Sequence, residues 1–143
     1  PVNGPSVAVA GENLAVAWFT GAGDEPRVKV AFSDDDGASF GPATVIDGGN
    51  PAGRVEVVGL QDGTALVAWL ERTGGEDAEV RVRQVRKDGT MSEGVSLTTS
   101  SSSRASGFPQ MVRAPDGSLV MAWTDVSVEP SQVRITRFRM EDQ

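Results

Sequence analysis

The sequence of 143 residues contains no cysteine, no histidine and no tyrosine. Without cysteine the chain can form neither a disulfide bond nor a catalytic thiolate. Without histidine it cannot supply a Ser–His or Cys–His catalytic pair, and a zinc site built on Cys and His ligands is not expected. We therefore predict no metal and no cofactor.

Basic residues and long apolar runs are also scarce. The formal net charge is −7, with 13 Lys and Arg against 20 Asp and Glu, and only Lys29 and Lys87 are lysines. Binding to a nucleic acid or to an anionic membrane surface needs a concentrated basic face, which this sequence does not show. No apolar run approaches membrane-spanning length, and no stretch has the pattern of a signal peptide. Neither nucleic acid nor membrane is expected as a partner.

The sequence does contain one short unit three times. It reads LAVAW at 14–18, ALVAW at 65–69 and LVMAW at 119–123, and each copy follows a turn signal rich in Gly, Asn and Asp. Trp69 lies 51 residues after Trp18, and Trp123 lies 54 residues after Trp69. Self-similarity at a period of this size indicates a repeat architecture.

Alternating apolar residues predict short strands around each copy. In Leu14–Trp18 the large side chains alternate with Ala15 and Ala17, which predicts a second layer packed closely against the alanines. The predicted strands are 5–10, 14–18, 27–32 and 42–47, then 54–58, 65–70, 79–85 and 94–99, then 110–113, 119–123 and 132–138. This pattern predicts an all-β fold of three four-stranded antiparallel β-propeller blades, at 1–49, 50–102 and 103–143, the last lacking its outer strand.

The turn after the third predicted strand reads SDDDGASF at 33–40 and fits the pattern S-x-D-x-G-x-x-[W/F]. It resembles the Asp-box, or BNR repeat, of sialidase-like β-propellers, and a decayed copy remains at 86–90. We expect a structural turn, in which Ser33 and Asp35 bond turn amides, Gly37 takes a positive φ and Phe40 pins the turn. Calcium binding by the three aspartates is the alternative, although nothing nearby completes a set of about six oxygen ligands.

The alternating connections of such blades place the longer loops on the face opposite the Asp-box, where we expect a ligand at the mouth of a central channel. The resemblance implies an arginine cluster that binds a sugar carboxylate through guanidinium groups. The candidates at this mouth are Arg54, Arg72, Arg104, Glu71 and Asp125. The alternative is that these are ordinary solvated loop charges, and the three tryptophans are expected to be core between blades rather than sugar-stacking platforms.

Catalysis is where the sequence departs from the resemblance. Sialidases use a tyrosine nucleophile activated by a glutamate, and tyrosine is absent here. Glu56 lies on a predicted inner strand, but a single carboxylate does not make a mechanism. The chain resembles the C-terminal half of a six-bladed propeller, and three blades cannot close a ring.

Two hypotheses about function follow. The first is a non-catalytic half-propeller that pairs with a second copy, or with a complementing half, and binds a glycan or a protein at the channel mouth. The second is a fragment of a sialidase or other glycoside hydrolase whose nucleophile lies in a missing half. The family resemblance implies an extracytoplasmic location, periplasmic or secreted.

Overall fold

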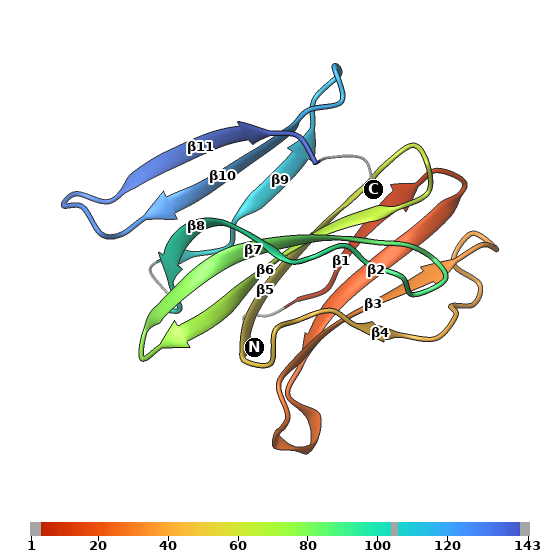
Figure 1. Ribbon diagram of the computed structural model, residues 1–143, viewed down its shortest axis with the longest axis horizontal. Helices are drawn as coiled ribbons and strands as arrows, with labels where there is room; N and C mark the ends of the chain where they lie inside the picture. The colour runs from red at the N-terminus through yellow and green to blue at the C-terminus, as the bar shows by residue number, and fades with distance from the viewer. Residues whose placement is uncertain (1–3, 104–105, 141–143) are drawn as a thin grey trace.

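The computed structural model describes residues 4–103 and 106–140, which form three antiparallel sheets that we call blades 1, 2 and 3 (Figure 1). Blade 1 contains β1 (Ser6–Ala10), β2 (Asn13–Thr20), β3 (Arg27–Ser33) and β4 (Thr44–Val45), with a 3-10 turn, η1 (Ala22–Asp24), between β2 and β3. Blade 2 contains β5 (Pro51–Gly59), β6 (Ala65–Gly74), β7 (Asp77–Val85) and β8 (Val95–Ser101). Blade 3 contains β9 (Gln110–Arg113), β10 (Leu119–Asp125) and β11 (Gln132–Phe138).

Every strand predicted from the sequence is present, and the fold class is confirmed. Three boundaries were wrong. The strand predicted at 42–47 is only Thr44–Val45, and β5 begins before Arg54 rather than at it. The predicted loop at 71–77 is mostly strand, because β6 and β7 continue their ladder past the core to a short hairpin at Gly74–Asp77.

Two apolar layers hold the three blades together. Between blades 1 and 2, Ala15 and Ala17 of β2 are fully buried against residues such as Val57 and Val67 of blade 2. This confirms that the two alanines face a closely packed layer. The second layer joins the other face of blade 2 to blade 3, and its fully buried members include Leu66 of β6 and Met121 of β10. Blade 2 is therefore the middle of the stack, packed on both faces (Figure 1).

The three tryptophans occupy equivalent positions, but their surroundings differ. Each pairs with a basic residue across the next strand, namely Trp18 with Lys29, Trp69 with Arg81 and Trp123 with Arg134. Trp69 is buried in the layer between blades 1 and 2, and Trp123 packs partly buried on the layer between blades 2 and 3. Trp18 belongs to neither layer, because its side of blade 1 is the outer surface of the stack.

The first strands of the blades, β1, β5 and β9, form the inner edge of the stack, where β5 contacts both of the others. The approach of β5 to β1 is very close at Gly59: a Cβ atom there would lie 1.6 Å from the carbonyl oxygen of Val9. Glycine is required at this point because there is no room for a side chain. Within the described ranges, no helix is long and apolar enough to cross a membrane.

Candidate functional site

The Asp-box turn between β3 and β4 has the hydrogen bonds that its sequence predicts. The Ser33 hydroxyl donates to Asp35 Oδ1 at 2.7 Å and accepts from the Gly37 amide at 2.9 Å. Asp35 also accepts from the amide of Ser39 at 2.8 Å and from its hydroxyl, and these bonds, above all the one to the Ser39 hydroxyl, lower the pKa of Asp35 from 3.8 to about 2. Gly37 has a φ of 88°. The box is thus a self-contained turn.

The Phe40 ring is 44% exposed, and the expectation that it pins this turn stays a prediction. Directly after it, the Gly41 amide donates to the Phe32 carbonyl at 2.9 Å, so the chain returns to β3. With Asp34 and Lys87, Phe40 lines a shallow pocket of about 240 Å³. Lys87 lies in the decayed box of blade 2, and its Nζ is 2.6 Å from Asp34 Oδ2. Charge pairing therefore links the two neighbouring turns.

Arg54 is a buried structural arginine. It lies within β5 at an irregularity in the ladder, with a φ of 55°. Its guanidinium donates to the carbonyls of Ser101 at the end of β8 and of Ser102, Ser103 and Gly107 in the loop after it, at 2.7–3.4 Å, and to the Ser106 hydroxyl. Phe108 lies beneath it, with its ring centroid 6.0 Å away. Burial, together with the charge of nearby Arg72, lowers the pKa of Arg54 below its usual value. The guanidinium closes this loop onto β5.

Glu71 is likewise engaged inside the fold. Its carboxylate is buried and accepts hydrogen bonds from the amides of Gly48 and Asn50, at 2.7 and 2.6 Å, and from Trp69 Nε1 at 2.8 Å. The connection between blades 1 and 2 is thereby held over Trp69. Glu71 thus has the role of an internal acceptor for the loop.

Arg72 and Arg104 are the other arginines predicted at the mouth. Arg72 is exposed on β6 and lies close enough to Arg54 to act on its charge. Among the described mouth candidates, it carries the only exposed guanidinium. Arg104 lies outside the described residues. Glu56, on the inner strand β5, accepts a 3.4 Å hydrogen bond from the Ser6 hydroxyl, and burial raises its pKa. The prediction that these residues bind a ligand together stays a prediction.

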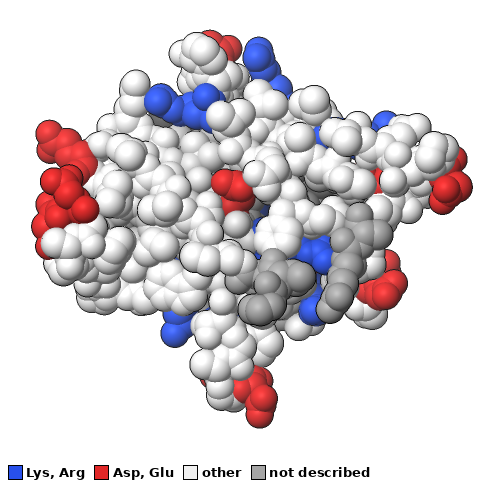
Figure 2. All heavy atoms as spheres, turned by 180° about the vertical axis from the view of Figure 1, so that it is seen from behind, with Lys and Arg blue, Asp and Glu red and all other residues white. Residues whose placement is uncertain are grey.

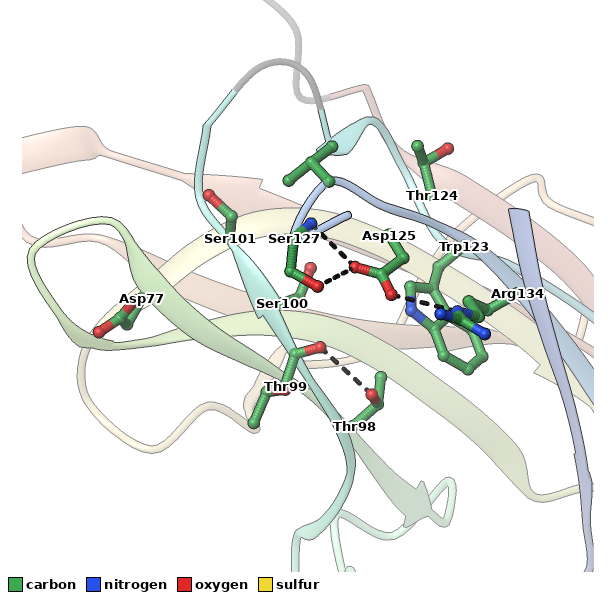
Figure 3. A pocket seen from close by; sticks show the side chains of 11 residues that line it. Asp77, Thr98, Thr99, Ser100, Ser101, Trp123, Thr124, Asp125, Ser127 and Arg134 are labelled. Carbon is green, nitrogen blue, oxygen red and sulfur yellow. Dashed lines mark hydrogen bonds and ion pairs between the residues drawn. The ribbon is translucent and has the colours of Figure 1, made fainter. Parts of the chain in front are cut away.

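Asp125 lies in a different place, a pocket of about 380 Å³ between blades 2 and 3 (Figure 3). Its Oδ1 accepts from the amide and hydroxyl of Ser127, and its Oδ2 is 3.1 Å from Arg134 Nε. These bonds, the Ser127 hydroxyl first, lower the pKa of Asp125. The other lining residues are Trp123, Thr124, Val126, Asp77 and the β8 segment Thr98, Thr99, Ser100 and Ser101.

Sequence reasoning does not find this pocket because most of its lining residues are small polar residues that form no recognisable motif. Thr98 and Thr99 lie in the strand predicted at 94–99, and Ser100 and Ser101 extend that strand into the Ser-rich run that indicates a connecting loop. They reach Trp123 only because blade 3 packs across that strand. No residue of the inner strands β1, β5 or β9 lines the pocket.

Charged side chains on the face opposite to the one seen in Figure 1 do not form a single patch. On the face drawn in Figure 2, the described acidic side chains stand mainly at the margins and the Lys and Arg side chains are scattered. Within the described ranges, no group of three or more acidic residues is placed to hold a metal ion.

Comparison with known proteins yields structural neighbours and no sequence relatives. No family model and no curated protein matches this chain. A Hadza microbial sialidase matches 97% of the chain with a TM-score of 0.59 and 16% identity, and a thermostable family-43 glycoside hydrolase matches 93% with a TM-score of 0.54 and 13% identity. The fold is that of part of a β-propeller. The chain spans only 34% and 49% of these two proteins.

Proposed function

We propose that this chain is a non-catalytic, sialidase-like propeller half that assembles with a second copy of itself into a closed ring. The supporting observation is that the two ends of the stack expose residues whose counterparts inside the stack are buried. We call the outer side of blade 1 the front face, with Val7, Val9, Leu14, Val16 and Trp18. We call the outer side of blade 3 the rear face, with Val112, Val120, Ala122, Val133 and Ile135.

The rear face shows the contrast most clearly. Val133 and Ile135 of β11 are 71% and 69% exposed. Strand register makes them equivalent to Val80 and Val82 of blade 2, both of which are fully buried. Leaving such valine and isoleucine side chains in water forgoes roughly 1.5–3 kcal/mol each relative to full burial. The rear face is therefore built like a surface that another blade covers.

The front face repeats the contrast at the other end. Val7, which is 65% exposed, is equivalent by register to Val57 of blade 2, which is buried. Trp18 is equivalent to Trp69, which is 1% exposed. Trp69 and Trp123 each face the preceding blade. By the same arrangement, Trp18 would face a blade that precedes blade 1 in the ring. Contiguous apolar surface of this kind marks an interaction site.

The two faces complement each other because they repeat the two sides of an internal blade junction. The rear face of one copy against the front face of a second continues the stack with the same pairing of sides. A head-to-tail contact of this type closes into a ring when the rotation allows it. Two copies then contribute six blades.

The test is the mass in solution of the purified chain and of two variants. We expect about twice the chain mass of 15.0 kDa, reduced to the single-chain mass by Ile135→Glu or Val7→Glu, because each buries a charge in the contact. Val95→Glu is the matched control: Val95 is an exposed valine on β8, away from both end faces. Circular dichroism checks that each variant is folded. A single-chain mass for the unmodified protein would contradict the proposal.

Ligand binding at the channel mouth is the finer part of the proposal. Among the described mouth candidates, Arg72 carries the exposed guanidinium, which a carboxylate-bearing glycan or an acidic protein segment could reach. Arg72→Ala is expected to abolish binding of sialyllactose at this mouth without changing the mass of the assembly. An extracytoplasmic location remains a prediction from the family resemblance.

A fragment of a glycoside hydrolase is the second candidate, and the partial coverage of both solved structures favours it. In this case the nucleophile would lie in a part that this chain does not contain. The purified chain alone would remain a monomer and inactive on a chromogenic sialoside, and a complementing half would restore turnover. Turnover by the purified chain itself that is lost in Arg104→Ala would contradict the non-catalytic proposal.

A further inference from the structure

We propose that the pocket between blades 2 and 3 is a saccharide-binding site, separate from the channel mouth and complete within one chain. Its volume of about 380 Å³ falls in the range of roughly 300–1,000 Å³ that is typical of ligand pockets. It is lined by β8 and Asp77 of blade 2 and by the β10–β11 end of blade 3, and by no residue of the inner strands β1, β5 or β9.

The other blade junction shows that this space is not an unavoidable gap. Between blades 1 and 2, the equivalent space is filled by Ile46, which pairs with Val28 and is fully buried. Val80 of blade 2 is the equivalent of Val28. Between blades 2 and 3, the position opposite Val80 is occupied by Thr98, which lines the pocket. A smaller, polar side chain stands where the first junction has an apolar one.

An acidic residue follows Trp69 and Trp123 by two positions, and the two carboxylates are used differently. At the first junction Glu71 is buried and accepts from Gly48 and Asn50, so the chain closes over Trp69. At the second junction, Asp125 bonds only Ser127 and Arg134 of its own hairpin within the part of the chain that the structure describes. The described residues of the connection after β8, 102–103 and 106–109, make no hydrogen bond to Asp125, and Trp123 is partly exposed.

The pocket presents the groups that a sugar ring needs. The Trp123 indole offers an apolar surface against which the C–H face of a pyranose can pack. Thr98 and Ser100, which share the face of β8 turned toward blade 3, carry hydroxyls that can both donate and accept hydrogen bonds. Arg134 uses Nε for Asp125, and within the described residues its two Nη groups have no hydrogen-bond partner (Figure 3). A polyhydroxylated ligand of one or two rings matches this mixture of one aromatic face and many small polar groups.

The experiment titrates the protein with three probes, cellotriose, xylotriose and sialyllactose, and follows the three indole N–H signals by NMR. We expect at least one probe to shift the Trp123 signal saturably while the buried Trp69 signal stays in place. Arg134→Ala should weaken binding by about tenfold, the effect of losing a charged hydrogen-bond donor. Arg137→Ala is the matched control, since this arginine lies on the same strand and does not line the pocket.

A second variant fills the space instead of removing a donor. Thr98→Ile copies the residue of the first junction, so it should retain the fold and abolish binding. The proposal is overturned if none of the three saccharides shifts the Trp123 signal, or if both Arg134→Ala and Thr98→Ile bind as tightly as the unmodified chain. Val7→Glu, which breaks the proposed assembly, should leave saccharide binding unchanged, so failure of one proposal is distinguishable from failure of the other.

Discussion

At the scale of single residues, the charged groups that the sequence singles out are largely used to close turns and loops. Arg54 bonds carbonyls 47–53 positions later in the chain, and Glu71 bonds amides 21 and 23 positions earlier. Local sequence patterns cannot indicate such distant partners. For this reason the Asp-box bonds, all within a few residues, could be predicted, whereas the internal roles of Arg54 and Glu71 could not.

Asp35 makes the stability of the Asp-box dependent on pH. Because its pKa falls from 3.8 to about 2 on folding, the stability it contributes is present above 3.8 and is lost as the pH falls toward about 2. We expect Asp35→Asn to lower the thermal midpoint at neutral pH, and the difference from the unmodified chain to shrink through that acidic window. Asp36→Asn is the control, since Asp36 is adjacent and exposed. An equal effect of the two substitutions at neutral pH would rule out this account of the turn.

Glu71 should matter for stability through its role as an acceptor. Glu71→Gln keeps the shape but turns one accepting oxygen into a donor that faces a backbone amide. We expect a loss of about 1–3 kcal/mol, the cost of leaving a buried polar group unsatisfied, measured by urea denaturation. Glu76→Gln makes the same chemical change at an exposed position of the same hairpin and should be neutral. A neutral Glu71→Gln would show that the loop between blades 1 and 2 is held by other contacts.

At the scale of elements, alternation of apolar residues was enough to place all the strands. It worked because apolar residues alternate with polar or small ones along most strands, whether the apolar side is buried between blades or lies on an end face. The errors occur where strands leave the core: polar residues such as Arg72 indicate a loop, although the ladder continues through them. The pocket was missed for the related reason that it is formed by the packing of two blades and not by either alone.

The contact between β5 and β1 provides a test of the inner edge. Gly59→Ala would place a methyl group 1.6 Å from the carbonyl oxygen of Val9. Backbone atoms cannot move aside as a flexible side chain can, so we expect a destabilisation of about 1–3 kcal/mol, as for overpacked cores. Gly74→Ala, where no atom lies within 4 Å of the added carbon, is the matched control. If both variants unfold at the same urea concentration, the close packing of β5 on β1 is not present in solution.

At the scale of the whole molecule, the chain is a stack of three blades with an apolar face at each end. Ile135 is equivalent to the buried Val82, and Trp18 to the buried Trp69. The two end faces therefore carry apolar side chains that lack the burial of their counterparts inside the stack. The sequence alone predicts an incomplete ring from its strand count. Only the packing shows which side chains remain to be covered.

Sedimentation velocity over a dilution series tests the central claim most directly, namely that two copies close the ring through these end faces. The account predicts one species of about twice the 15.0 kDa chain mass, which becomes a folded single chain when Ile135 is replaced by glutamate. A single-chain species at every concentration, with Ile135→Glu causing no change, would contradict it.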